Sequence, residues 1–214
     1  MRLDALDGRT QLQKLCYRLV RQMTLWPTLV HGKLALRDGN PSVNRFTLIQ
    51  KAQQAKQAMD SISVDLDALI ERHELVKCIP ATCLSDLVSE MFEFKDPMAA
   101  VVMCYHATFS IAVDQILLSL DDTDFEKARL KYRIEFLSRR IWMLVEHGLQ
   151  NKPLGLPILQ SSLFMTVDLA LCQAQEQIIA IMNELDSAQR SDSGCWTREK
   201  IIYRARLFRG DCAA

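Results

Sequence analysis

Glycine and proline, the residues that most often interrupt helices, are scarce in this chain, with 7 glycines and 6 prolines among 214 residues. Leu, Ala, Gln, Glu and Arg, which favour helices, are plentiful. No segment alternates apolar and polar residues with the period of two that half-buried strands show. These absences argue against a β-sheet protein and predict an all-α fold.

An excess of charge of one sign is also lacking, because 26 basic residues balance 26 acidic ones. A neutral chain has no overall attraction for nucleic acid or for anionic membranes. One basic amphipathic segment does occur near the C-terminus, with Arg198, Lys200, Arg204, Arg206 and Arg209. Such a segment can contact phosphate or acidic partners, but we expect a solvated face whose apolar side packs on the rest of the protein.

Catalytic and metal-binding motifs are lacking as well. The sequence contains no GxSxG, HExxH, Walker phosphate loop or GxGxxG. Its seven cysteines form no CxxC pair, and the nearest two, Cys78 and Cys83, flank Pro80. The polar N-terminus, MRLDALDGRT, does not look like a signal peptide. We therefore expect reduced intracellular thiols that pack as small apolar groups, with no zinc site and no cofactor.

One long apolar run is present at residues 96–120, DPMAAVVMCYHATFSIAVDQILLSL. Asp96 suits a helix cap and Pro97 suits the first helical position, so a helix over 97–120 is predicted. After Asp96, the only charged residue of the run is Asp114. A helix that is apolar all round must be surrounded by protein or by lipid.

Protein is the expected surrounding. The uncharged part, 97–113, is at the lower limit for spanning a bilayer. His106 and Asp114 would both be costly in lipid. We expect a buried helix in which His106, which has no partner three or four residues further on, makes a hydrogen bond. Asp114 should reach a polar partner or the helix end.

Amphipathic segments flank this helix on both sides. Helical spacing of apolar residues and helix-ending signals predict helices at about 9–25, 44–73, 84–91, 123–147, 157–186 and 196–208. Pro27 should end the first helix and open a loop, and Gly148 should end the one that begins at a Thr123–Glu126 capping box. We expect a single irregular bundle of six to eight helices, with a domain at 1–190 and a basic C-terminal helix and tail at 191–214.

Acidic residues cluster at Asp121, Asp122, Asp124 and Glu126. Carboxylate clusters bind Mg²⁺, as in the DDxxD motif of all-helical terpene synthases. Here the third carboxylate is out of register, and a second N-D-x-x-S-x-x-x-E motif does not occur. Acidic residues are also favoured at a helix start, so a cap is expected. The other histidines, His31, His73 and His147, fall near predicted helix ends.

Two blocks together resemble the C-terminal regulatory region of fungal zinc-cluster transcription factors. The first is FEFKDPMAAVVMCYHATFSIAVDQILLSL, a Phe-rich turn followed by an apolar helix with a Leu-rich end. The second is LSRRIWMLVEHGLQNKPLGLPILQSSLFMTVDLALCQAQEQIIAIMNEL, which closes on an I-x-x-I-x-x-L pattern. The resemblance covers roughly residues 12–190 and consists of hydrophobic patterns.

The resemblance implies a non-catalytic regulatory domain in transcriptional control, in the nucleus or otherwise the cytoplasm, and not secreted or in a membrane. Its targets could include a secondary-metabolite gene cluster, and its partners would be proteins, a second copy of the chain among them. The family's six-cysteine DNA-binding array does not occur here. Direct DNA binding is therefore not expected, and the chain would be a fragment, a truncated product or a stand-alone paralogue. The alternatives are a terpene-synthase-like enzyme using Asp121, Asp122 and Glu126, and a generic helical interaction scaffold.

Overall fold

A computed structural model describes residues 2–72, 76–81, 87–120, 124–150, 156–167, 172–189 and 195–211. The fold is predominantly helical, as the composition predicts. The helices are α1 (Arg2–Met23), α2 (Trp26–Arg37), α3 (Arg45–Glu71), α4 (Pro97–Leu120), α5 (Asp124–Trp142), α6 (Val145–Gln150), α7 (Leu156–Phe164), α8 (Cys172–Gln189) and α9 (Arg198–Arg209). Two short strands, β1 (Val76–Pro80) and β2 (Glu90–Phe94), form an antiparallel pair.

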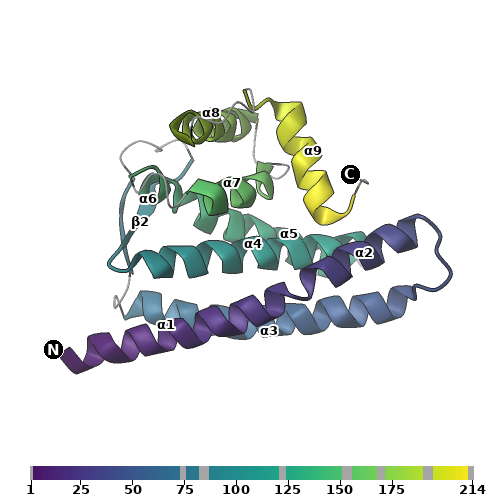
Figure 1. Ribbon diagram of the computed structural model, residues 1–214, viewed down its shortest axis with the longest axis horizontal. Helices are drawn as coiled ribbons and strands as arrows, with labels where there is room; N and C mark the ends of the chain where they lie inside the picture. The colour runs from purple at the N-terminus through teal and green to yellow at the C-terminus, as the bar shows by residue number, and fades with distance from the viewer. Residues whose placement is uncertain are drawn as a thin grey trace.

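The helices lie in layers on either side of α4 (Figure 1). On one side, α1 and α2 run beside α3, which returns in the opposite direction. On the other side α7 packs on α4, and α8 and α9 cover α7. α5 lies alongside α4 and contacts it over much of its length. The apolar helix is thus enclosed by protein on several sides.

The predicted central helix, 97–120, is confirmed to the residue. The Asp96 carboxylate accepts a hydrogen bond from the Met98 N–H at 2.9 Å, and the Asp96 carbonyl accepts one from Ala99 N–H at 3.0 Å, so the cap forms as expected. Among the described residues, α4 is the one helix long and apolar enough to cross a membrane, and most of its apolar stretch is buried inside the protein. Burial by neighbouring helices therefore accounts for its apolar composition.

The helix predicted at 44–73 is confirmed as α3. Asn44 caps it, because its side-chain oxygen accepts a hydrogen bond from the Phe46 N–H at 2.8 Å. Its buried side chains follow the helical period: Leu48, Ala52, Ala55, Met59, Ile62, Leu66 and Leu69. This stripe faces α4 and α1.

The prediction of a loop after Pro27 is wrong, because a helix, α2, occupies these residues. Pro27 instead lies in the first turn of α2, where a missing N–H costs no hydrogen bond. The turn between α1 and α2 is short, at Thr24 and Leu25. Gly39, with φ of 73°, lies in the turn that follows α2.

The strands were not predicted. Residues 90 and 91, expected at the end of a helix over 84–91, belong to β2, and 84–86 lie outside the described residues. Met91 and Phe92 are both buried, so β2 lacks the alternation of a half-buried strand. The Phe92 N–H on its outer edge donates to the Met143 carbonyl at 3.0 Å, which joins the strand pair to the helices.

Two long predicted helices are each divided. The segment 123–147 forms α5 and α6 with a turn at Met143 and Leu144, and Gly148 lies inside α6 rather than ending it. The segment 157–186 forms α7 and α8, and Thr166 in the intervening turn donates to the Leu163 carbonyl at 2.9 Å. The last helix is confirmed as α9, with Thr197 as its cap.

Candidate functional site

The charged residue of the apolar helix is paired inside the protein. Asp114 of α4 is fully buried, and Nη1 of Arg133 on α5 donates to its two carboxylate oxygens at 2.6 and 2.7 Å. Nη2 of the same arginine lies 2.6 Å from a carboxylate oxygen of Asp60 on α3. Arg133 therefore links three helices, and the expected polar partner of Asp114 is confirmed.

Burial raises the pKa of Asp114 to about 7, although Arg133 and Lys56 act in the opposite direction. Asp60 adds to the increase because its carboxylate repels a second negative charge nearby. The carboxyl faces no solvent and its oxygens are occupied by Arg133. This group holds helices together and is not placed to meet a substrate.

His106 is the second polar group of the central helix. Its Nε2 donates to the Met59 carbonyl of α3 at 2.9 Å, which confirms the expected buried, hydrogen-bonded histidine. The Ser110 hydroxyl, four residues further on, lies 3.5 Å from the same nitrogen, a contact that was not expected. Burial lowers the pKa of His106 to about 4, so the ring is neutral at pH 7.

A third buried polar group joins α4 to α7. The Thr108 hydroxyl lies 2.6 Å from the Ser162 hydroxyl, and the Cys104 thiol lies 3.1 Å from the same oxygen. Burial raises the pKa of Cys104 to about 11, so this thiol is protonated and unreactive at neutral pH. These residues satisfy one another inside the core.

The acidic cluster is only partly described. Asp121, Asp122 and Thr123 lie outside the described residues, so the capping box and the proposed magnesium ligands are not placed. Asp124 and Glu126 occupy the first turn of α5, where they are favoured by the helix dipole. Glu126 lies 3.7 Å from Arg129. Across the described segments, no group of three or more His, Cys, Asp or Glu is arranged to hold a metal ion.

The basic C-terminal segment packs by its apolar side, with Ile201 and Ala205 buried. Arg209 and Lys33 both bind the Asp211 carboxylate. Basic residues on the exposed side are Arg198, Lys200, Arg204 and Arg206. The arrangement matches a solvated basic face over an apolar contact.

The other singled-out residues are dispersed. His31 lies in α2, while His73 and Cys83 are not among the described residues. Cys78 is exposed on β1 and carries a free thiol. His147 of α6 contacts the Phe94 ring with 4.8 Å between ring centres, and burial lowers its pKa.

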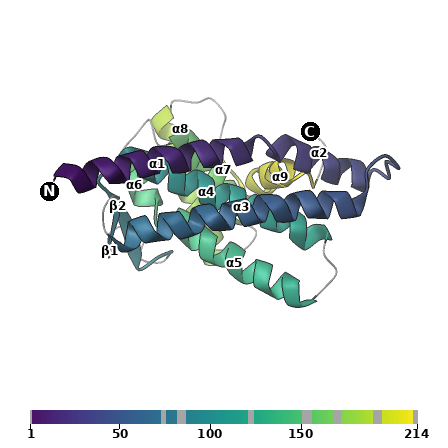
Figure 2. The ribbon, with the colours of Figure 1, turned by 90° about the horizontal axis from the view of Figure 1, so that it is seen from below.

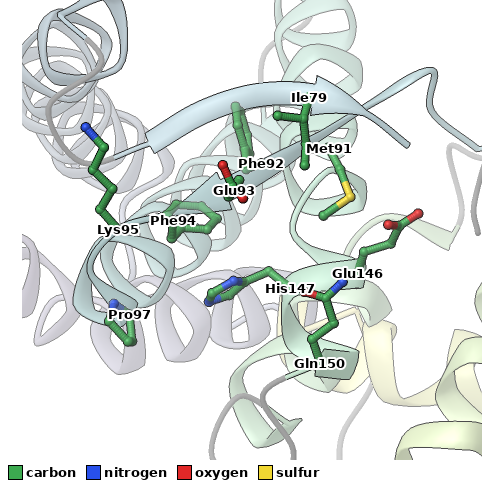
Figure 3. A pocket seen from close by; sticks show the side chains of 10 residues that line it. All are labelled: Ile79, Met91, Phe92, Glu93, Phe94, Lys95, Pro97, Glu146, His147 and Gln150. Atoms are coloured by element: carbon green, nitrogen blue, oxygen red, sulfur yellow. The ribbon is translucent and has the colours of Figure 1, made fainter. Parts of the chain in front are cut away.

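A cavity of about 400 Å³ opens beside the strand pair (Figure 3). Apolar side chains from β1 and β2 line one part, and Glu146, His147 and Gln150 of α6 line another. In Figure 3 the imidazole of His147 points toward Phe94 and lies away from the Glu146 carboxylate.

The outward side of α5 carries exposed aromatic side chains. Phe125, Tyr132 and Phe136 are 79%, 75% and 47% exposed. Spaced by seven and four residues, they form one stripe, flanked by Arg129 and Arg139. We call these five residues the α5 face. The helix α5 itself lies on the side of α3 away from α1 (Figure 2).

The α5 face has the chemistry of an interface. Aromatic and arginine side chains are enriched where proteins bind one another. The guanidinium of Arg140 also lies 4.8 Å from the centre of the Phe136 ring, which fixes that ring on the helix. The sequence did not single out this face, because its aromatic residues alternate with charged residues along the exposed side of the helix.

Comparisons with protein-family models, with curated proteins and with solved structures found no match. The resemblance to fungal zinc-cluster transcription factors thus rests on the hydrophobic patterns of the two quoted blocks. The geometry of the described residues is the independent basis for a function.

Proposed function

We propose that this chain is a non-catalytic helical regulatory domain that acts in transcriptional control by binding proteins through the α5 face. The observation that carries the proposal is the exposed stripe that Phe125, Tyr132 and Phe136 form on α5. Large apolar side chains gathered on one exposed helix face commonly mark an interaction surface.

The polar groups of the core support a non-catalytic role. Asp114, His106 and Cys104 are the buried groups with the most perturbed pKa values, and such groups often mark catalytic sites. Here each is hydrogen-bonded to a neighbouring helix. Burial and internal pairing explain all three pKa changes without a substrate.

The transcriptional setting comes from the resemblance and not from the geometry. It implies a nuclear protein, with a cytoplasmic location as the alternative, and targets that could include a secondary-metabolite gene cluster. Protein partners fit the α5 face better than DNA does, because the carboxylates of Glu126 and Glu135 alternate with the arginines. A phosphate backbone would meet these carboxylates directly.

The enzyme alternative keeps a defined test. A terpene-synthase-like protein needs Asp121, Asp122 and Glu126 to hold Mg²⁺. Mg²⁺-dependent turnover of a prenyl diphosphate, lost in an Asp121→Ala, Asp122→Ala variant, would establish the enzyme and contradict our proposal.

The regulatory proposal is tested by tethering. The complete chain is fused to an unrelated DNA-binding domain upstream of a reporter gene in fungal cells. We expect reporter output to differ from that of the DNA-binding domain alone, in either direction. Equal output from the two proteins, at equal expression, would contradict a role in transcription and leave the generic scaffold.

A further inference from the structure

We propose that the α5 face binds the α5 face of a second copy of this chain, with the two helices antiparallel around a twofold axis near Tyr132. This inference rests on the proposed function, because it names the partner of the same face. It follows from how the exposed side chains of α5 are ordered along and around the helix.

Around the helix, the aromatic stripe is central and the charges lie on two flanks. At 100° per residue, Asp124, Lys131, Glu135 and Arg139 fall on one flank, and Arg129 falls on the other. All five are exposed. In an antiparallel pair with a perpendicular twofold axis, each flank meets the same flank of the partner.

Along the helix, a twofold axis pairs residues whose numbers have a constant sum. With Tyr132 opposite the partner's Tyr132 the sum is 264, and Lys131 lies on the same flank as the partner's Glu135, offset from it by two residues, or about 3 Å along the axis. Asp124 and the partner's Arg139 are offset by one residue, or about 1.5 Å along the axis. Both of these pairs join opposite signs, and each occurs twice.

The other contacts of this register are also complementary. Phe136 comes opposite the partner's Ala128, a small residue that leaves room for the ring. The neighbouring Arg129 of the partner lies on the flank toward which Phe136 is displaced, so a cation–π contact can form. The aromatic groups of both copies thus meet small, aromatic or cationic neighbours.

The existing ion pairs of α5 do not prevent this rearrangement. Arg139 lies 3.5 Å from Glu135 and Arg129 lies 3.7 Å from Glu126, with all four side chains at least 40% exposed. Exposed pairs of this kind contribute little to stability, so exchanging them for contacts between copies costs little.

The area available fits a weak dimer. The exposed parts of the three aromatic side chains amount to about 400 Å² per copy. Two copies with their flanking charged side chains approach the lower end, about 1,200 Å², of specific interfaces. Val64 of α3, exposed beside the Asp60 and Asp67 carboxylates that bind α5, adjoins this area. A dissociation constant on the order of 10 μM is expected.

A second copy suits the flanks better than an acidic partner helix. An acidic helix would pair with Arg129 and Arg139 but would place carboxylates against Asp124 and Glu135. In the antiparallel pair of two copies, the acidic and the basic side chains of the flank both meet residues of opposite charge. An acidic partner is the outcome indicated if the chain proves monomeric.

Charge reversal tests the register directly. Sedimentation velocity is measured for the wild type, for Lys131→Glu, for Glu135→Lys, and for an equimolar mixture of the two variants. Each variant alone places like charges opposite one another twice, so its dissociation constant should rise about tenfold. The mixture restores both opposite-charge pairs and should form a heterodimer close to wild-type affinity. The double variant Lys131→Glu, Glu135→Lys should also dimerise.

An exposed ring on another helix provides the control for this test. Tyr17→Ala removes a ring that is 74% exposed on α1 and should leave association unchanged. Circular dichroism checks that each variant is folded. A wild type that is monomeric at about 300 μM, well above the expected dissociation constant, overturns the inference. So does a mixture that associates no better than its components. The proposed function is judged separately by the reporter, which can respond whether or not the chain dimerises.

Discussion

Arg133 holds Asp114 inside the protein, with its Nη1 2.6 and 2.7 Å from the two carboxylate oxygens. The pair joins α5 to the buried α4, and Asp60 extends it to α3. This arginine, together with the buried apolar side of α5, therefore sets the position of the helix and the orientation of the α5 face.

Replacing Arg133 by Met should destabilise the protein in a pH-dependent way. Arg133 is the largest of the influences that lower the pKa of Asp114, so its loss raises that pKa further above the unfolded value of 3.8. A raised carboxyl pKa gives stability that is present below the unfolded pKa and is lost as pH rises through the folded pKa. The variant should lose about 3 kcal/mol at pH 8 and clearly less at pH 5, measured by urea unfolding.

The matched control is Arg139→Met, on the exposed side of the same helix. It should change the free energy of unfolding by less than about 0.5 kcal/mol. An equal loss at pH 5 and pH 8 for Arg133→Met would show that Asp114 does not titrate as described.

His106 should make the protein less stable in acid. Its pKa is lowered from 6.5 to about 4 by burial, so its contribution is present above pH 6.5 and is lost as pH falls through the folded value. A pKa change of this size corresponds to about 3 kcal/mol. His106→Gln keeps a donor for the Met59 carbonyl but does not titrate. The difference in stability between wild type and this variant should therefore change between pH 7 and pH 4, and parallel pH profiles would contradict the assignment.

The cysteines should differ in reactivity in the native protein. Cys195 is exposed, whereas Cys104 is buried with a pKa raised to about 11. Only the thiolate reacts with iodoacetamide at an appreciable rate. Peptide mass spectrometry after brief labelling at pH 8 should find Cys195 modified and Cys104 unmodified until urea is added. Early modification of Cys104 would mean that α4 and α7 separate readily.

Gly148 allows α6 and α7 to approach closely. A Cβ atom at this position would lie 2.6 Å from Cδ2 of the buried Leu159. Gly148→Ala should therefore cost about 1–2 kcal/mol of unfolding free energy. The same substitution in a Leu159→Ala background should cost less, because the clashing methyl is gone. Equal costs in the two backgrounds would exclude this contact as the cause.

The regular parts of the fold follow from local sequence. α3 and α4 begin at Asn44 and Asp96, residues whose side chains accept N–H groups of the first turn. Each then keeps its pattern for more than 20 residues. Local signals of this strength predicted the central helix to the residue.

The breaks and the strands follow from distant contacts. α5 ends at Trp142 with no Gly or Pro nearby, and the Met143 carbonyl that it frees accepts a hydrogen bond from Phe92 of β2. Proline is compatible both with the end of one helix and with the first turn of the next, so Pro27 alone did not decide between them. The partner of Asp114 could not be predicted either, since several basic residues of neighbouring segments could reach it. The spacing of Phe125, Tyr132 and Phe136, seven and four residues, does predict one helix face. The charged residues between them hide this pattern.

The tethered reporter with an altered α5 face tests the central claim most directly. A Tyr132→Ala, Phe136→Ala variant removes two exposed rings without disturbing the buried side of α5, so it should fold normally but lose the reporter response. The Tyr17→Ala control, which removes an equally exposed ring from α1, should keep the full response. A full response from the folded double variant would contradict the claim that this protein regulates through the α5 face.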